Sequence, residues 1–421
     1  MTQFDWSDVT QRGEALARPR ERGEAALRDS VAGIVEDVRT RGWVALVEQS
    51  MRIDGAAPVA VAIAPLAAAA RQSLSVEAQA AIALAAQAIE TFHRATLPSD
   101  IIVETHPGLT VAKQWRALRR VGLYVPGGKA PLFSTLLMLA IPARVAGVSE
   151  LVVVTPPQAG GGLDPTIALA AEISGIETIW TVGGAQAIAA LAFGAGDIPA
   201  VDRICGPGNA WVALAKSLVA SIPGGPGIDL PAGPSELLVI ADDSADPATV
   251  AADLLSQAEH DPDAQVLLVS PSAAMIDAVE REVDAQAGSI GGQFAPKRFI
   301  RCADLDEAMA IANIYAPEHL SLACDGAEAM VASITNAGAI FVGHCAAESF
   351  GDYLAGSSHV LPTDGAARFT GGVSTMTFMK AITVQHVTTE AAAALARPAA
   401  LLARLEGLEA HARAAEARQV A

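Results

Sequence analysis

The sequence lacks the glycine pattern GxGxxG by which a nicotinamide-binding fold is usually recognised. This absence removes the most direct prediction of a dinucleotide cofactor. Aromatic residues are also scarce, at 4% of the 421 residues, and charged residues reach only 18%, whereas hydrophobic residues make up 52%. This balance excludes a disordered chain and is typical of helices packed on buried aliphatic strands.

Cysteine and positive charge are scarce as well. The four cysteines form no CxxC pair, which favours reduced thiols in the cytoplasm over a disulfide framework. With 46 acidic and 28 basic residues the net charge is -18, so nucleic acid is not an expected partner. The longest apolar run, residues 56–70, contains two prolines and is shorter than the ~18–20 residues that cross a bilayer. The charged N-terminus does not resemble a signal peptide, and we therefore expect a cytoplasmic protein without a membrane segment.

The order of apolar runs predicts an α/β protein. Residues 27–97 have helical spacing, and from about residue 120 short β-branched runs alternate with Ala-rich helical stretches. Such alternation predicts βαβ units and two α/β domains of similar design. The tail, residues 388–418, is predicted to be an amphipathic helix that docks on a partner subunit. The predicted strands are at 121–125, 151–155, 178–182, 202–205, 236–241 and 265–270.

Three glycine-rich turns each follow a predicted strand and precede a predicted helix: VPGGKAP at 125–131, VGGAQA at 182–187 and CGPGNA at 205–210. Each turn exposes backbone N–H groups to which an anion or a ribose can bind. The alternative is that these glycines only turn the chain. Together the three turns favour a ligand at the carboxyl ends of the strands.

Several polar side chains have the chemistry of metal ligands. Gln257 and His260 lie three residues apart near a helix end, and Asp352 and His359 lie in a loop rich in Gly and Ser. With His411 on the tail helix they suit zinc or manganese, but their spacing does not prove that they converge. Polar residues at a helix end are usually solvated, so this reading stays open. Surface or structural roles are assigned to the remaining histidines, His93, His106, His344 and His386.

The segment YAPEHL, residues 315–320, places Glu318 beside His319 directly after a proline. In one interpretation both side chains face solvent after a helix end. In the other they are neighbouring bases, one able to remove a hydroxyl proton and the other able to activate water. The residues alone do not decide between the two interpretations.

Taken together, the motifs resemble the histidinol dehydrogenase family from about residue 25 to the end. AGPSE, SQAEH and PEHL are highly specific in combination. The likeness rests on the strings VGLYVPGG, VGGAQAIAALAFGAG, GPGNAWVALAK, DLPAGPSELLVIAD, LLSQAEHDPDAQ, YAPEHL, GDYLAGSSHVLPT and EGLEAHARAA.

The resemblance implies an activity, two cofactors and a set of site residues. The family oxidises L-histidinol to L-histidine in two NAD-dependent steps through the aldehyde, the last reactions of histidine biosynthesis, and works as a zinc-containing homodimer. His319 matches the base that takes the alcohol proton, and Glu318 matches the residue that activates water for the second oxidation. The positions that match zinc ligands are Gln257, His260, Asp352 and His411, with His411 expected from the partner subunit's C-terminal arm. Further substrate contacts match Ser235, His359 and Glu406, the last again from the partner's arm, and NAD contacts match Tyr124, Gln186 and Asn209.

The resemblance also implies a fold of two incomplete Rossmann-like domains with a small N-terminal segment and a C-terminal helical arm. The expected ranges are 1–23 for the N-terminal segment, 24–122 plus 237–369 for a discontinuous first α/β domain, 123–236 for a second, inserted α/β domain, and 370–421 for the dimerisation arm.

Two departures from the expected pattern weaken the assignment of the substrate. Phe133 and Phe350 stand where Pro and a smaller aliphatic residue are expected, and Phe350 is two residues from Asp352. A relative with the same residues acting on another primary alcohol, such as dihydroxypropanesulfonate, is the nearest alternative, although its anionic head group would need a cation in place of Glu406. A zinc hydrolase that uses Glu318 without NAD and a non-catalytic binding protein are alternatives from other classes.

Overall fold

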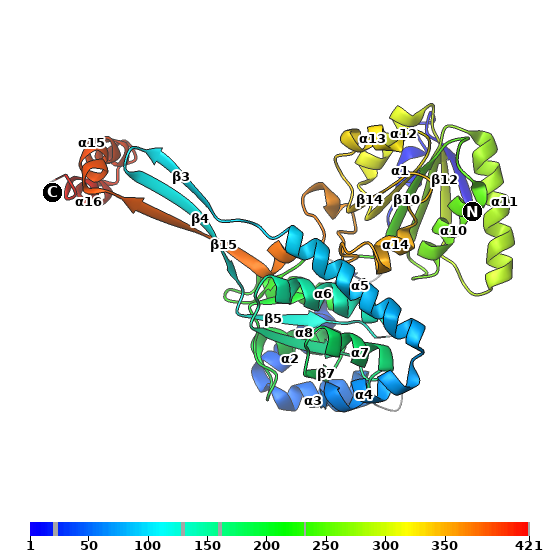
Figure 1. Cartoon of the computed structure of the whole chain (residues 1–421), viewed down its shortest axis with the longest axis horizontal. Helices are drawn as coiled ribbons and strands as arrows, with labels where there is room; N and C mark the ends of the chain where they lie inside the picture. The colour runs from blue at the N-terminus through cyan, green and yellow to red at the C-terminus, as the bar shows by residue number, and fades with distance from the viewer. Residues whose placement is uncertain (20–23, 128–130, 159–161, 231–232, 420–421) are drawn as a thin grey trace. The chain divides into compact units, whose positions relative to one another are not determined.

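The computed structural model describes residues 1–19, 24–127, 131–158, 162–230 and 233–419. It confirms the predicted α/β class, because two sheets are dominated by parallel strands and have helices on both faces (Figure 1). The chain forms two compact units, one of residues 1–95 with 119–378 and one of residues 96–118 with 379–421. None of the helices in these ranges is long and apolar enough to cross a membrane.

The first sheet has the strand order β1-β12-β11-β10-β13-β14, and every pairing is parallel. Alternate residues of β10 enter two different apolar clusters: Leu237 and Val239 pack with α10 and α11, whereas Leu238 and Ile240 pack with α12. The sheet is therefore buried on both faces, as its continuous aliphatic runs predict. Its elements are β1 (Thr2–Asp5), β10 (Glu236–Ala241), α10 (Pro247–Ala258), β11 (Gln265–Ser270), α11 (Ala273–Ile290), β12 (Lys297–Arg301), α12 (Leu305–Tyr315), β13 (His319–Ala323), β14 (Ala339–Val342) and the short helices α1 (Arg12–Ala15), α13 (Ala327–Met330) and α14 (Glu348–Tyr353).

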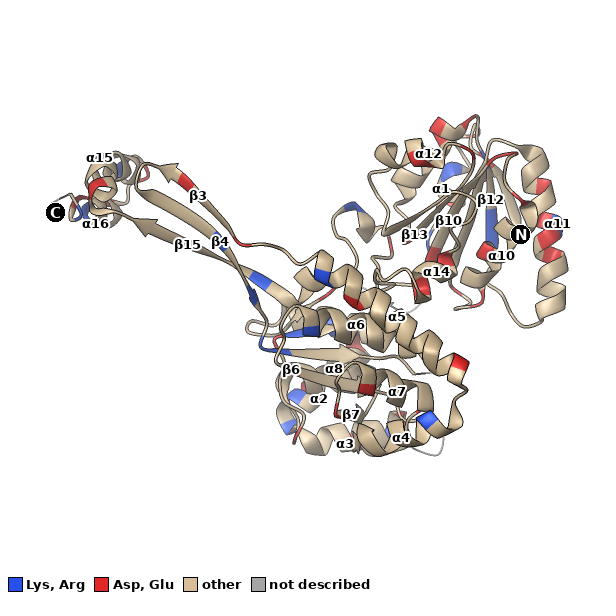
Figure 2. Cartoon of the chain, viewed as in Figure 1, with Lys and Arg blue, Asp and Glu red and all other residues tan. Residues whose placement is uncertain are grey.

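The second sheet has the order β2-β7-β6-β5-β8-β9 and is parallel except for its edge strand β2. Charged residues are sparse on α7 and α8, whereas acidic residues recur along α11 of the other sheet (Figure 2). The elements are β2 (Ala60–Ala62), β5 (Arg120–Tyr124), α6 (Phe133–Val145), β6 (Glu150–Thr155), α7 (Pro165–Ile173), β7 (Thr178–Thr181), α8 (Gly184–Phe193), β8 (Arg203–Cys205), α9 (Ala210–Ser221) and β9 (Gly227–Ile228).

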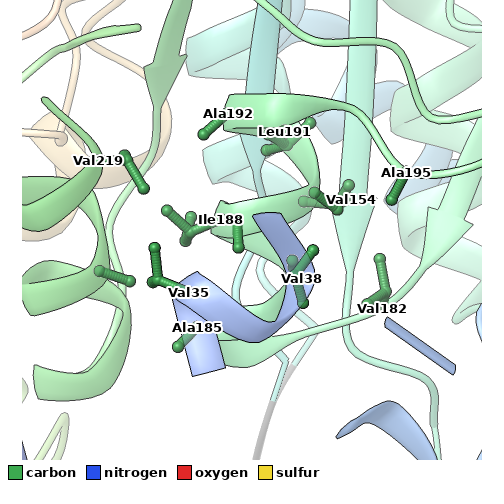
Figure 3. Close-up of a cluster of buried hydrophobic side chains, with 14 of the residues drawn as sticks. Val35, Val38, Val154, Val182, Ala185, Ile188, Leu191, Ala192, Ala195 and Val219 are labelled. Atoms are coloured by element: carbon green, nitrogen blue, oxygen red, sulfur yellow. The ribbon is translucent and has the colours of Figure 1, made fainter. Parts of the chain in front are cut away.

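The N-terminal helices pack with this second sheet. Val35 and Val38 of α2 lie in one apolar cluster with Ile188 of α8 and Val154 of β6 (Figure 3). This packing differs from the predicted grouping of residues 24–122 with 237–369, because the apolar stripe of α2 is buried on α8. Helical periodicity shows which face of a helix is buried but does not show which sheet covers it. These helices are α2 (Glu24–Arg41), α3 (Trp43–Ile53), α4 (Ile63–Ser73) and α5 (Val76–Ala95).

The second unit contains an antiparallel sheet of order β15-β4-β3 and two helices. The predicted helical tail is confirmed, with a break at Gly407, whose φ of 77° is left-handed. The sheet was not expected, and two of its three strands come from residues 96–118, outside the range predicted for the arm. The elements are β3 (Ile101–His106), β4 (Leu109–Ala117), β15 (Met379–Val387), α15 (Thr389–Leu405) and α16 (Glu409–Glu416).

Candidate active site

The YAPEHL segment lies at the amino-terminal edge of the first sheet. The helix α12 ends with Ala316 in a left-handed conformation, with φ of 56°, and Pro317 prevents it from continuing. The strand β13 then begins at His319, in register with Leu237 of the neighbouring strand β10. This register brings Glu318 beside Glu236, the first residue of β10.

Glu318 and His319 are both buried, with 5% and 4% of their surfaces exposed. The interpretation in which they face solvent is therefore wrong. The Oε2 atom of Glu318 accepts a hydrogen bond of 2.9 Å from the backbone N–H of Glu236. Burial raises the pKa of Glu318 well above its ordinary value, because removal from water disfavours the charged form.

The hydrogen bonding of His319 selects one tautomer. Its Nδ1 atom lies 3.1 Å from the backbone carbonyl oxygen of Glu236, which can only accept a hydrogen bond. The proton of a neutral ring is therefore on Nδ1, and Nε2 keeps the lone pair of a base. Burial lowers the pKa of His319 to about 4, so the ring is neutral at neutral pH.

A third buried carboxylate, Glu348 of α14, was not singled out from the sequence. It is 2% exposed, its Oε1 atom lies 3.5 Å from His319 Nδ1, and neither oxygen has a hydrogen-bond partner in the described part of the chain. Burial raises its pKa well above the ordinary value, and the charges of Asp352 and Glu318 add to the effect. The signal that was available is its spacing of four residues from Asp352, which places both on one face of a helix.

The structure distributes the predicted zinc ligands between its two units. Gln257, near the end of α10, is fully buried, and both polar atoms of its amide lack a hydrogen-bond partner within the described ranges. His260 follows α10 and is exposed, and Asp352 lies half-buried on α14, which packs against α10. His411 belongs to α16 in the other unit and is exposed, as is Glu406, the residue that ends α15.

These residues fit a metal ion in part. An amide oxygen, imidazole nitrogens and a carboxylate are ligands that zinc accepts, and the buried amide of Gln257 needs a polar partner. The described residues contain no group of three or more His, Cys, Asp or Glu side chains placed to hold a metal. Gln257, His260 and Asp352 supply only two side chains of those types, so a complete set needs a further ligand.

The loop that carries His359 is held by the helices α5 and α6. Nδ1 of His359 lies 3.2 Å from the carbonyl oxygen of Asp352, and Nε2 lies 3.0 Å from Oγ1 of Thr135. Gly356 has φ of 89°, and a Cβ there would lie 2.5 Å from the carbonyl oxygen of Ala88 in α5. Glycine is therefore required for the loop to reach this position. Ser235, the residue before β10, is half-buried at the same edge of the sheet as Glu318.

The three glycine-rich turns lie at the carboxyl ends of β5, β7 and β8 in the second sheet. Strand order reverses at β5, because β6 lies on one side and β8 on the other, and such switch points bind ligands in open α/β sheets. Tyr124 ends β5, and residues 206–209 follow β8. Residues 128–130 of the first turn are outside the described residues.

Two of the residues expected to contact NAD are buried and hold one of these turns. The hydroxyl of Tyr124 accepts a 3.2 Å hydrogen bond from the Gly184 N–H. The carboxylate of Asp54, which was not predicted, accepts hydrogen bonds from Gln186 Nε2 (3.0 Å) and from the Gly183 N–H (3.2 Å). Burial raises the pKa of Tyr124 to about 12. The Oε1 atom of Gln186 has no hydrogen-bond partner in the residues described.

The third, Asn209, is exposed and caps α9, and its Oδ1 atom accepts hydrogen bonds from the N–H groups of Trp211 and Val212. A buried ion pair between Lys216 and Asp229 holds the same turn. Lys216 Nζ donates a 2.8 Å hydrogen bond to the Gly206 carbonyl, and Asp229 Oδ2 accepts one of 2.7 Å from the Gly206 N–H. Both polar groups of Gly206 are thus satisfied by one ion pair.

The two unexpected phenylalanines do not fill the buried site. The side chain of Phe350 on α14 is 55% exposed, and Phe133 is the half-buried first residue of α6.

Comparison with known proteins identifies the family of this chain. The model of the family described as histidinol dehydrogenase matches residues 17–419. A histidinol dehydrogenase of Xanthomonas euvesicatoria is 46% identical over 98% of this chain and 97% of its own length, and one of Xylella fastidiosa is 45% identical over the same shares. The crystal structure of histidinol dehydrogenase from Elizabethkingia anophelis matches with a TM-score of 0.94 and 38% identity, over 99% of this chain and 98% of that one. The chain therefore belongs to the histidinol dehydrogenase family and is an oxidoreductase.

Proposed function

We propose that this protein oxidises L-histidinol to L-histidine through the aldehyde, with NAD as the electron acceptor and zinc as a bound cofactor. Membership of the family supports the reaction. The observation that carries the proposal is the buried pair Glu318 and His319, whose side chains are both held by the backbone of Glu236. Two bases in one buried place suit a reaction that moves a proton in each of two steps.

In the first step His319 would take the proton of the substrate hydroxyl at Nε2, and NAD, when bound, would supply the acceptor for the hydride of that carbon. The ring would become a cation, and its Nδ1–H stays on the Glu236 carbonyl oxygen. The charge of Asp352 favours this cation and opposes the burial that disfavours it.

In the second step Glu318 would take a proton from the water that attacks the aldehyde, and NAD, when bound, would again supply the hydride acceptor. A carboxylate with an ordinary pKa is a weak base at neutral pH, and the raised pKa of Glu318 makes it a stronger one. The hydrogen bond from Glu236 fixes Oε2, so the other oxygen, Oε1, is the one that takes the proton.

The remaining assignments follow the family. Gln257, His260 and Asp352 would hold zinc together with His411 of the partner subunit, and zinc when bound supplies a positive template that orients the substrate. Ser235 and His359 would contact the substrate, with Glu406 of the partner subunit. Tyr124, Gln186 and Asn209 would contact NAD at the switch point of the second sheet.

The proposed assembly is a homodimer in the cytoplasm. Free thiols support that compartment, since all four cysteines are unpaired.

The test is NADH formation by the zinc-loaded protein with L-histidinol, counted against substrate consumed. Two NADH per histidinol are expected. His319→Asn should abolish turnover, whereas His344→Asn, at an exposed ring whose charged neighbour is Asp325, should leave turnover unchanged.

Turnover of dihydroxypropanesulfonate without turnover of histidinol would show that this other alcohol is the substrate. If NAD caused no thermal shift and the protein hydrolysed an ester or amide, the protein would be a hydrolase and not a dehydrogenase.

A further inference from the structure

The proposed function assigns no role to the N-terminal segment, residues 1–19. Its strand β1 extends the first sheet beside β12, and α1 follows. After α1 the chain places Arg18 against the amino-terminal edge of the sheet, where its guanidinium contacts Glu236.

Glu236 is the residue on which both proposed bases depend. Its N–H donates to Glu318 Oε2 at 2.9 Å, and its carbonyl oxygen accepts from His319 Nδ1 at 3.1 Å. One peptide segment therefore orients both side chains. Any shift of the Glu236 backbone would move the two bases together.

The side chain of Glu236 is fixed by Arg18 in a two-point ion pair. Arg18 Nε lies 2.5 Å from Oε1 and Nη2 lies 2.9 Å from Oε2. The carboxylate side chain is 1% exposed and that of Arg18 is 18% exposed. Such parallel pairs fix geometry as well as charge. A buried carboxylate without this cation would be driven to take up a proton or to move toward water.

Arg18 also contacts the segment that leads to the bases. Its Nη2 donates a 2.8 Å hydrogen bond to the carbonyl of Tyr315, and its guanidinium lies 4.0 Å from the centre of the Tyr315 ring. Tyr315 is the last residue of α12, three residues before Glu318. Arg18 thus joins Glu236 to the segment that leads to Glu318 and His319.

The same carboxylate organises a turn on the other side. Glu236 Oε1 accepts a 3.1 Å hydrogen bond from the N–H of Asp364, whose φ of 54° is left-handed. The preceding Thr363 accepts a 2.6 Å hydrogen bond from the N–H of Gly233, in the segment that leads to Ser235. The ion pair therefore also fixes the turn at Asp364.

We infer that Arg18 is a positioning residue for the reaction: through Glu236 it holds Glu318 and His319 in the geometry that proton transfer needs. The inference rests on the proposed function. It predicts a loss in the chemical steps without a loss of substrate or metal binding, because Arg18 contacts none of the residues proposed to hold zinc or NAD.

The test compares Arg18→Met with Arg12→Met in the full-length, zinc-loaded protein. Arg12 is a matched control, because it lies in the same segment, donates a 2.8 Å hydrogen bond to the Trp6 carbonyl and stacks 4.8 Å from the Trp6 ring, but does not contact Glu236. Arg18→Met should lower kcat about 10- to 100-fold, since a displacement of about 1 Å costs that much. KM for L-histidinol and bound zinc should be unchanged, and Arg12→Met should keep the wild-type kcat.

A double variant shows whether Arg18 acts through Glu236. Glu236→Gln combined with Arg18→Met should be no slower than the slower single variant, because both changes break the same link. Arg18→Lys should recover part of the lost kcat. Four results would overturn the inference. In the double variant the two single losses of kcat could multiply, or Arg18→Met could keep the wild-type kcat. Arg18→Met could also change only KM, or Arg12→Met could lower kcat as much as Arg18→Met does. Wild-type turnover of L-histidinol is measured in the same assay, so failure of the proposed function is recognised separately.

Discussion

The buried ion pair between Lys216 and Asp229 leads to a quantitative prediction for Lys216→Met. The side chains are 1% and 0% exposed. Asp229 also accepts hydrogen bonds from the N–H groups of Gly206 (2.7 Å) and Leu230 (2.8 Å). Methionine has nearly the volume of lysine, so the substitution removes the cation with little change in packing and leaves a buried carboxylate without a counter-charge.

The expected cost is about 3–5 kcal/mol, the usual penalty for breaking a buried pair by removing one partner. In the compact unit of residues 1–95 and 119–378, an unfolding entropy of about 2.1 cal/mol/K per residue makes 1 kcal/mol correspond to about 1–2 °C in Tm. The Tm of this unit should therefore fall by about 3–10 °C. Affinity for NAD should fall as well, because the pair holds the CGPGNA turn that is proposed to contact the cofactor.

A double variant tests whether the uncompensated charge of Asp229 causes the loss of stability. Asp229→Asn added to Lys216→Met removes the uncompensated charge, while the amide oxygen still accepts a backbone N–H. The double variant should be more stable than Lys216→Met by about 1–2 kcal/mol.

Lys297 provides the control, because it is 7% exposed and forms no ion pair among the described residues: its Nζ donates a 3.3 Å hydrogen bond to the Ala295 carbonyl and lies 5.2 Å from the centre of the Phe294 ring. Burial lowers the pKa of Lys297, against the smaller opposite effect of the Asp284 charge, so Lys297→Met should change stability by less than about 1 kcal/mol. Differential scanning calorimetry measures all three variants. A Tm change under about 2 °C for Lys216→Met, or a double variant less stable than it, would refute the reasoning.

Three other variants test separate parts of the site and the fold. Glu318→Gln should slow the second oxidation by about 100-fold or more and spare the first, which rapid-quench analysis would detect as accumulated aldehyde; equal losses in both steps contradict the division of roles. His411→Asn should lower bound zinc and activity without changing the far-UV circular dichroism, and full zinc content with full activity would contradict a shared site. Burial lowers the pKa of His93 from 6.5 to about 4, and neither ring nitrogen has a hydrogen-bond partner among the residues described. As pH falls, His93 therefore binds its proton in the unfolded chain before it does so in the folded protein. The free energy of unfolding should decrease by about 1–3 kcal/mol between pH 6.5 and pH 4. In urea titrations the free energy of unfolding of His93→Leu should depend less on pH between 6.5 and 4 than that of the wild type. The same pH dependence in both proteins would contradict a buried, neutral His93.

The strands of the buried sheets could be predicted because their signal is local. The runs at 236–241 and 265–270 match β10 and β11 residue for residue, since uninterrupted aliphatic stretches between turn residues are typical of strands buried on both faces. The strand β13 was missed, because HLSLA begins with the polar residues of the site. β3 was missed for another reason: most of its residues are exposed, so IIVETH has no buried face to produce alternation.

The residues of the site could be named from the motifs of the sequence, but their physical states could not. YAPEHL is compatible with solvated or buried side chains, and the register of β13 on β10 decides between them by covering Glu318 and His319. Glu348 was missed, because nothing in ESFGDY shows that its carboxylate lies beside the imidazole of His319, 29 positions earlier.

By itself the sequence determined the α/β class, six strands of the two main sheets (β5, β6, β7, β8, β10 and β11), the amphipathic tail and the resemblance that names the candidate bases. These depend on local composition and on short motifs, which fold or bind by rules that apply within a few residues. Only the tertiary structure decided that α2 packs on α8, that Glu236 holds both bases, and that Arg18 fixes Glu236 from 218 positions away. Contacts of that kind depend on how separate elements meet, and no pattern within one segment encodes which distant segment will cover it.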